Sequence, residues 1–523
     1  MLEAARAYRK DNDQMLTQRQ IQRGLYMGGL ERARKFVHKF VQGESVKVLL
    51  VGGSIMFGVG AYGEPNIKQW MEKWFLAVGP RRPDGAPFDN VRITNAAQRA
   101  TPSAYMNLCL KEHVKEHDFD LVIVEYGVND VLRPLPYMDN EPRKSLELLL
   151  RKLLNFPSRP AVALLNIYRW FGDEQVPNSN PLRIKPQPYY NSPDADFFEY
   201  ASYYGLQSIS LKAAAYHRMV AGDPGFKVDN VRLEIENRTA QQDFVNSLFY
   251  EDHSHPAGGT GMKVLAELIQ GMITHVAASL LYRPWRPQAE EQYINEPLPR
   301  PLIPGNMDSA ADACVSGERL QTVAVERQGF EWLNEGTAQA PKWGFTAKTP
   351  GSTIVFALDE ATKSLETAAA PAASGPTPAV KGSLVILAFL KTYENIGTAH
   401  ITCEGGCVCG DKAVAAVEAA EAAARDPAAA AGQTAIVADP KEVVATMEGY
   451  WPEPQSQLQL GCTLAVLGPG CRLRVTVAAE TKTNSHKFKI GALMVSTTAA
   501  SIGQLWCART GIAESAQVLA GGV

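Results

Sequence analysis

Residues 46–58 read VKVLLVGGSIMFG, an apolar run that ends in a serine flanked by glycines. The run predicts a buried strand, and the glycines allow the backbone to turn sharply after it. Ser54 would then lie at the carboxyl end of a parallel strand, where a substrate can approach closely. That placement suits a nucleophile. The plainer interpretation is a strand-to-helix turn in which the serine caps the helix.

A serine hydroxyl needs a neutral imidazole to take its proton and a carboxylate to orient that imidazole. Asp252 and His255 offer both groups in the sequence DHSHP, residues 252–256, just before a long apolar helix that begins near Gly258. Three residues apart in a tight turn, the carboxylate can reach Nδ1 while Nε2 points toward the serine. His253 is a competing candidate for the base, and the alternative for His255 is that it caps the following helix.

A second buried strand, DLVIVEY at 120–126, runs into GVND at 127–130. With these segments the chain resembles the SGNH (GDSL-type) hydrolase superfamily, whose four blocks occur here in order. The resemblance covers residues 46–282. It implies a three-layer α/β/α, flavodoxin-like domain with a parallel sheet, and a serine esterase that needs neither cofactor nor metal. The matching blocks are Gly53-Ser54 with Gly58, Asn95 to Thr101, Gly127 to Asp130, and Asp252 with His255-Pro256.

The resemblance also implies an oxyanion hole, because the tetrahedral intermediate of acyl transfer needs hydrogen-bond donors. We expect the Asn129 amide and the Ser54 backbone N–H to be two of them. The third donor of the superfamily is the backbone N–H of a residue that is usually glycine, and Ala97 occupies that place here. A donor survives that change only if φ is negative at Ala97.

Gly53 is a second departure, since most relatives carry aspartate before the serine. That aspartate is not a triad member, and we interpret the change as the mark of a eukaryotic Gly-Gly-Ser subgroup. Gly53, Gly127 and Asp130 are predicted to support the site, with Asp130 fixing its loop by hydrogen bonds. Gly53 and Ala97 also motivate the alternative of an inactive scaffold that keeps the fold.

Strands and helices alternate through the predicted catalytic domain, 46–283, which favours a parallel sheet covered on both faces. The segment 1–45 predicts a helical extension packed on this domain. The stretch 170–204 is irregular and is either a lid or substrate wall, or a surface loop. The predicted strands are 46–52, 91–95, 120–126 and 160–168, and the predicted helices are 66–77, 103–116 and 143–154.

A proline-rich linker is predicted at 284–310, and the pattern changes after it. Short alternating strands indicate an antiparallel β-sandwich, jelly-roll-like, over 311–498, followed by a tail at 499–523. Two low-complexity segments interrupt this domain. The predicted strands are 352–358, 383–392, 398–403, 471–478 and 486–495, and the low-complexity segments are 362–378 and 414–431.

Composition excludes two classes of partner. The net charge is −3 at pH 7 and no basic run occurs, which argues against nucleic acid and anionic membrane surfaces. No eighteen-residue apolar stretch is present, so we expect no membrane span. The N-terminal segment has no apolar h-region and therefore no recognisable signal peptide.

Seven of the eight cysteines lie in the C-terminal half. Disulfides are the preferred interpretation and favour the secretory pathway or the extracellular space, with possible glycosylation at Asn237. The alternative is a cytoplasmic protein with free thiols. A zinc site at Cys403, Cys407 and Cys409 is disfavoured, because the spacing lacks paired Cys-x2-Cys knuckles. Cys109 is expected on a helix in the catalytic core.

These observations predict an SGNH-type serine esterase that removes acetyl groups from a carbohydrate through an acyl-enzyme. One alternative is an O-acyltransferase that passes the acyl group to a sugar hydroxyl with the same triad. Another is an inactive scaffold that binds a glycan or a protein. Three tryptophans, Trp332, Trp343 and Trp451, are candidates for stacking on sugar rings, the alternative being core packing.

Overall fold

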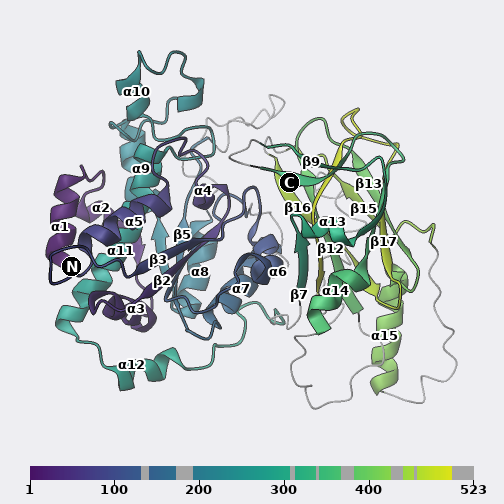
Figure 1. Cartoon of the computed structure of the whole chain (residues 1–523), viewed down its shortest axis with the longest axis horizontal. Coiled ribbons are helices and arrows are strands. Elements are labelled where there is room, and N and C mark those ends of the chain that lie inside the picture. The colour runs from purple at the N-terminus through teal and green to yellow at the C-terminus, as the bar shows by residue number, and fades with distance from the viewer. Residues whose placement is uncertain are drawn as a thin grey trace, which may run out of the picture. The chain divides into compact units, whose positions relative to one another are not determined.

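The structure is a computed structural model that describes residues 1–130, 141–171, 193–306, 312–336, 341–366, 382–425, 440–452 and 456–496. The chain forms two compact units (Figure 1). The first comprises Met1–Met106 and Val114–Asn306. The second comprises Asn107–His113 and the described residues that follow Met307.

A six-stranded sheet forms the centre of the first unit, in the order β1-β6-β5-β4-β2-β3. The five strands after β1 are parallel, and β1 pairs with β6 in the antiparallel sense. Numbered along the chain, the parallel strands follow the order 2-1-3-4-5, one of the two common orders of doubly wound sheets. The strands are β1 (Leu25–Tyr26), β2 (Val46–Gly52), β3 (Val91–Asn95), β4 (Leu121–Glu125), β5 (Ala161–Asn166) and β6 (Gln207–Ser210).

All four strands predicted for this region are present, and β1 and β6 are additions to the prediction. β6 is short and reads QSIS, which gives no apolar run to detect. β1 has only two residues, and its pairing with β6 extends the sheet by a part of the chain that we expected to be helical.

Helices cover both faces of this sheet, as its sequence requires. Val48 and Leu50 of β2 share a core cluster with residues of α3, α5, α9 and α11, while Leu49 and Val51 are equally buried on the opposite face. Strands buried on both faces read as near-continuous apolar runs. The helices α7 and α8 contact β5. The helices named here are α3 (Glu31–Val41), α5 (Ile67–Val78), α7 (Glu141–Leu154), α8 (Asp194–Tyr204), α9 (Leu211–Ala221) and α11 (Lys263–Tyr282).

The N-terminal segment contains three helices rather than one: α1 (Leu2–Asp11), α2 (Gln18–Arg23) and α3. Part of the proline-rich stretch folds on the same unit as α12 (Pro287–Ile294). Arg34 of α3 joins the two, because its guanidinium forms a bidentate pair with Glu290 of α12 at 2.7 and 2.8 Å. Both side chains are 1 % exposed.

The helical segment Gly258–Tyr282, which includes α11, is long and apolar enough to cross a membrane by length and composition. The core helix of a soluble protein meets the same test. Most of its residues from Val264 to Ile273 are buried, and it contacts α3 and α5. Packing in the core therefore accounts for its composition.

The second unit contains two antiparallel sheets. One has the order β14-β16-β12-β18-β10-β9 with β7 paired to β18, and the other has the order β15-β13-β17-β11-β8. Buried residues of both sheets, such as Phe345 and Ile354, belong to one apolar cluster. The strands are β7 (Asp312–Ser316), β8 (Ala324–Gln328), β9 (Glu331–Asn334), β10 (Trp343–Ala347), β11 (Thr353–Ala357), β12 (Gly382–Lys391), β13 (Thr398–Glu404), β14 (Val408–Cys409), β15 (Ala445–Glu448), β16 (Gln457–Val466), β17 (Arg472–Val477) and β18 (Phe488–Ser496).

The five strands predicted here are β11, β12, β13, β17 and β18, and the antiparallel character is confirmed. The jelly-roll-like sandwich stays a prediction. The low-complexity segments are helical in part, as α14 (Leu358–Glu366) and α15 (Asp411–Arg425). The remainder of both segments, the tail 499–523 and most of the irregular stretch 170–204 lie outside the described residues.

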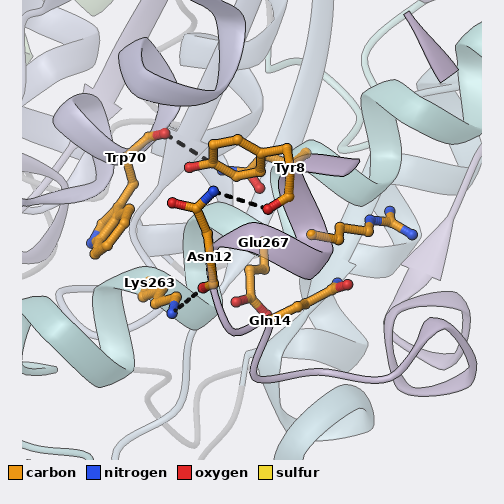
Figure 2. Close-up of a pocket in the computed structure, with 8 residues that line it drawn as sticks. Tyr8, Asn12, Gln14, Trp70, Lys263 and Glu267 are labelled. Carbon is orange, nitrogen blue, oxygen red and sulfur yellow. Dashed lines mark hydrogen bonds between the residues drawn. The ribbon is translucent and has the colours of Figure 1, made fainter. Parts of the chain in front are cut away.

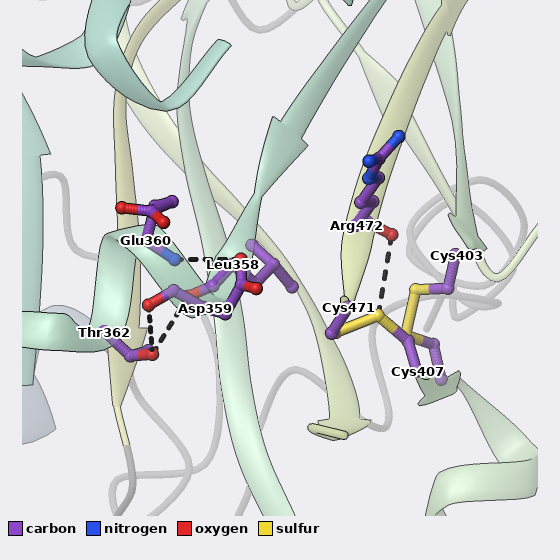
Figure 3. Close-up of a disulfide and its surroundings, with 9 residues drawn as sticks. Leu358, Asp359, Glu360, Thr362, Cys403, Cys407, Cys471 and Arg472 are labelled. Carbon is purple, nitrogen blue, oxygen red and sulfur yellow. Dashed lines mark hydrogen bonds between the residues drawn. A yellow bond between two sulfur atoms is a disulfide. The ribbon is translucent and has the colours of Figure 1, made fainter. Parts of the chain in front are cut away.

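Disulfides link cysteines of the second unit: Cys403 to Cys409, and Cys407 to Cys471. The Cys407 Sγ also contacts the backbone carbonyl of Arg472 (Figure 3). These cysteines are buried and close together, so the sulfur atoms that could ligate a metal are engaged in disulfides instead.

Cys109 lies buried on the helix α6 (Ser103–His113), as expected, but in the part of that helix that belongs to the second unit rather than to the catalytic core. It forms a disulfide with Cys314 of β7. The two positions are 205 residues apart in sequence, a separation at which nothing in the local pattern indicates a pair.

We predict that Arg34→Met destabilises the first unit. The substitution keeps the apolar volume but leaves the Glu290 carboxylate buried without its partner, which typically costs about 3–5 kcal/mol. Urea unfolding at neutral pH measures the loss. The double variant Arg34→Met with Glu290→Leu should recover much of it, and a double variant as unstable as the single one would contradict the account.

Candidate active site

Adjacent parallel strands bring the predicted nucleophile and its oxyanion asparagine together. β2 and β4 pair in register, with Leu50 opposite Ile123 and Gly52 opposite Glu125. Ser54 follows β2 directly and is the first residue of the short helix α4 (Ser54–Phe57). Its N–H belongs to the amides at a helix start that have no acceptor within the helix.

Ser54, His255 and Asp252 form a continuous chain of contacts. His255 Nε2 lies 2.8 Å from Ser54 Oγ. The other ring nitrogen, Nδ1, lies 2.8 and 2.9 Å from the two carboxylate oxygens of Asp252. With the proton on Nδ1, the imidazole donates to the carboxylate and presents Nε2 as an acceptor to the serine hydroxyl. This arrangement can take a proton from Ser54.

The turn that carries Asp252 holds its carboxylate in place. Oδ1 accepts the backbone N–H of Ser254 and of His255, each at 2.8 Å. Burial raises the pKa of the Asp252 carboxyl, but the hydrogen bonds and the charge of His255 outweigh it, so that the pKa lies below its usual value. The carboxylate is therefore ionised at neutral pH and fixes the imidazole tautomer.

Backbone contacts support this turn from both sides. The Glu251 N–H donates to the carbonyl of His255 at 2.8 Å. Gly60, with φ of 99°, lies so close that a Cβ there would be 2.9 Å from the His255 Cβ. The loop after α4 thus packs on the base that serves Ser54.

His253, the competing candidate, lies elsewhere. Its ring packs edge-on against Phe171 at 5.0 Å, and its Nε2 lies 3.4 Å from a carboxylate oxygen of Glu234. The structure places His255 against the serine instead.

Asn129 lies against Gly53, and this contact gives the Gly-Gly-Ser sequence a physical reason. A Cβ on Gly53 would be 1.9 Å from Asn129 Oδ1. Aspartate, or any residue with a side chain, cannot occupy position 53 while Asn129 keeps this place. Asn129 is 8 % exposed, so its amide is held in the site rather than in solvent.

The backbone of Ala97 does not have a positive φ, which is the condition under which its N–H can serve as an oxyanion donor. Its N–H, however, donates to Asn95 Oδ1 at 3.0 Å. An oxyanion at this donor would have to compete with that carboxamide. Asn95 in turn donates through Nδ2 to the carbonyl of Met56 at 2.9 Å, which fixes it beside α4.

The two remaining predicted residues act on the loop of Asn129. Gly127 lies where a Cβ would be 2.7 Å from the carbonyl oxygen of Ile167, so only glycine fits at the end of β4. Asp130 is 2 % exposed and accepts the backbone N–H of Ser103 at 2.8 Å. It therefore fixes the loop to the start of α6.

Glu125 is a polar residue of this region that sequence reasoning did not single out. It is the last residue of β4 and is completely buried. Burial raises the pKa of its carboxyl to about 8, although nearby backbone N–H groups act in the opposite direction. The sequence signal was a glutamate at the end of an apolar strand, two residues before the glycine of GVND.

Comparison with known proteins supports the fold. The sequence matches no model of a known protein family, and no curated protein matches it. Among solved structures, the chain is similar to a two-domain esterase active on acetylated mannans, with 18% identity and a TM-score of 0.52. The match covers 92% of this chain and 99% of that chain, and at this identity it shows a shared fold.

Two shorter matches fall on less than half of this chain. A lipase/acylhydrolase from Enterococcus faecalis has 18% identity and a TM-score of 0.27, covering 44% of this chain and 96% of its own. A catalytic mutant of an acetylxylan esterase from Geobacillus stearothermophilus has 15% identity and a TM-score of 0.28, covering 44% and 95%. We draw no argument from these two.

We predict that Gly53→Ala impairs the site without unfolding the chain. The new Cβ displaces the Asn129 amide, and loss of one oxyanion donor typically costs about 10²–10³ in rate. The rate at which Ser54 reacts with p-nitrophenyl acetate measures the effect. Gly29→Ala is a matched control, because a Cβ there meets its nearest atoms at 3.4 Å. Equal rates in the two variants would contradict the steric argument.

We predict that Glu125→Gln changes the pH dependence of stability. The pKa of this carboxyl is about 8 in the folded chain and 4.5 normally, so folding favours the protonated form. The stability that the protonated carboxyl contributes is complete below its normal pKa of 4.5. It is lost as the pH rises from there toward about 8, the pKa of the group in the folded chain. The wild type should lose about 1.4 kcal/mol of unfolding free energy per pH unit in this window relative to the variant.

Chemical denaturation of both proteins at several pH values tests this linkage. The neighbouring Tyr126 couples to Glu125, but burial raises the pKa of Tyr126 well above its usual value. Tyr126 therefore stays neutral through this pH window in both proteins and does not contribute to the difference between them. Parallel stability curves for the two proteins would contradict a raised pKa at Glu125.

Proposed function

We propose that this chain is a serine ester hydrolase of the SGNH type. The observation that carries the proposal is the chain of contacts of 2.8 Å from Ser54 Oγ to His255 and from His255 to Asp252. The resemblance of the sequence blocks and the fold shared with a two-domain esterase support it. Ser54 acts as nucleophile, His255 as general base and acid, and Asp252 as the group that orients the imidazole.

The reaction proceeds through an acyl-enzyme. Ser54 Oγ attacks the acyl carbon of the ester while its proton passes to His255 Nε2. The tetrahedral intermediate then expels the alcohol, which leaves with that proton. A water molecule attacks the acyl-enzyme in the same way, with His255 taking and returning a proton, and the carboxylic acid is released with Ser54 restored.

Two donors stabilise the developing oxyanion in this proposal. The Ser54 N–H is available by its position at the start of α4, and Asn129 adds its side-chain amide. Ala97 joins them as a third donor once its N–H is released from Asn95 Oδ1. Gly53 and Gly127 support the hole by letting Asn129 and its loop approach closely.

We propose an acetylated carbohydrate as the substrate class. The two-domain esterase with the shared fold is active on acetylated mannans. This is an argument from fold, which sets an expectation rather than a specificity. The disulfides of the second unit fit an oxidising compartment, and we propose the secretory pathway or the extracellular space as the location.

We predict that the purified chain hydrolyses p-nitrophenyl acetate and releases acetate from acetylated mannan. Ser54→Ala and His255→Ala should each lower kcat by at least about 10³, since the triad acts as a unit. His253→Ala is the matched control, because this neighbouring histidine faces Glu234 rather than the serine. It should retain activity.

Three outcomes separate the possibilities. Loss of activity in Ser54→Ala and His255→Ala but not in His253→Ala supports the hydrolase. A mass gain of about 42 Da per site on an added acceptor glycan would indicate acyl transfer to a sugar instead. This gain is what the replacement of a hydroxyl hydrogen by an acetyl group adds. A wild type as inert as the Ser54→Ala variant would indicate a binding scaffold.

A further inference from the structure

The loop that follows α4, residues 58–65, packs on the backbone that follows the general base. A Cβ on Gly60 would be 2.6 Å from the carbonyl oxygen of Pro256. A Cβ on Gly258 would be 2.6 Å from the Cβ of Glu64. The loop begins where the helix of the nucleophile ends, and the backbone that it meets continues from the turn of the base. Two segments far apart in sequence are therefore in close contact beside the triad.

The Glu64 carboxylate joins this loop to the backbone after His255. Its Oε2 accepts the backbone N–H of Gly259 at 2.5 Å. Gly259 is the second residue of a π-helical turn, Gly258–Met262, and the cap residue Ala257 makes no side-chain hydrogen bond. The N–H of the second helical residue is one that a side-chain cap usually accepts. Glu64 therefore supplies, from a distant loop, the cap that this helix start lacks.

Arg232 binds the same carboxylate oxygen. Its Nη1 donates to Glu64 Oε2 at 2.8 Å, and its Nη2 donates to Thr260 Oγ1 at 3.3 Å. The Arg232 side chain is 5 % exposed, whereas that of Glu64 is 37 % exposed. The Arg232 N–H also donates to the carbonyl of Tyr250 at 3.1 Å, shortly before Asp252. One ion pair thus connects the loop, the helix start and the segment that leads to the triad aspartate.

Such an ion pair contributes little to stability by itself. Burying a guanidinium costs free energy that its partner recovers only in part, and apolar residues of similar volume often stabilise a fold as well. Hydrogen bonds to a carboxylate add a fixed distance and direction. The segments that they fix here adjoin Ser54 and His255, whose reacting atoms lie 2.8 Å apart. The contacts therefore indicate a role in placing these two side chains.

We propose that Glu64 is a positioning residue. Its carboxylate, held by Arg232, ties the loop after α4 to the helix start after His255 and so keeps the imidazole at hydrogen-bonding distance from Ser54. Glu64 acts through these two backbone segments and takes no part in proton transfer. The inference rests on the proposed function for its catalytic consequence.

The kinetic test compares Glu64→Ala and Glu64→Gln with the wild type on p-nitrophenyl acetate. Glu64→Ala removes the acceptor. We expect its kcat to fall about 10–100-fold with KM nearly unchanged, because a displaced base acts on the transition state rather than on binding. Glu64→Gln keeps an acceptor oxygen at the same reach and should retain kcat within about threefold.

Glu267→Ala is the matched control. Glu267 is also a glutamate of the first unit that holds a loop through backbone N–H groups, those of Met15 and Leu16. It lies beside Tyr8 and Asn12 (Figure 2). Because it holds an N-terminal segment rather than the turn of the base, this substitution should lower stability without lowering kcat.

Hydrogen exchange gives a readout that does not depend on catalysis. A peptide that spans 257–262 should exchange faster in Glu64→Ala than in the wild type and in Glu64→Gln. Should the wild type prove catalytically inert, the proposed function fails, while the exchange result still decides whether Glu64 holds this helix start. If Glu64→Ala does not fold, Glu64→Asp, whose carboxylate is one carbon shorter, carries both measurements.

Four results would overturn the inference. Unchanged kcat or unchanged exchange in Glu64→Ala would remove the tie between the segments. A loss of activity carried by KM rather than kcat would assign Glu64 to substrate binding. A Glu64→Gln variant as impaired as Glu64→Ala would assign the effect to charge rather than to an acceptor. An equal fall of kcat in Glu267→Ala would assign it to general loss of stability.

Discussion

The parallel pairing of β2 with β4 is the constraint on which the site depends. Both strands are buried on their two faces, so their register is fixed by the core. Because parallel strands end at the same edge, the turns that follow them meet, and Gly53, the residue before Ser54, comes to lie against Asn129. The His255 turn then needs only to reach this edge, and it does so just before α11 begins.

Glycines shape this edge of the sheet as much as the residues with side chains do. Gly52, Gly53 and Gly127 each stand where a Cβ would lie less than 3.0 Å from a neighbouring atom. Gly52 admits the Glu125 side chain, Gly53 admits the Asn129 amide, and Gly127 admits the backbone that follows β5. Close packing of this kind places donors accurately, which is what stabilisation of an oxyanion requires.

Much of the first unit could be predicted from sequence, because most of its strands are apolar runs and its site residues lie in short blocks with a recognisable pattern. Asp252 and His255 are three residues apart, and a tight turn brings them together. Other features depend on tertiary neighbours. Little local signal is left by the Cys109 disulfide, the short β6, the competition of Asn95 for the Ala97 N–H and the buried Glu125. Seven of the twelve strands described in the second unit were also missed.

The central claim is that His255, oriented by the Asp252 carboxylate, makes Ser54 a nucleophile. Reaction of the intact chain with a fluorophosphonate probe, followed by peptide mass mapping, tests it most directly. We predict one adduct, on Ser54, that forms at least about 10³ times more slowly when His255 is replaced by alanine. Absence of an adduct on Ser54, or labelling that does not depend on His255, would contradict the account.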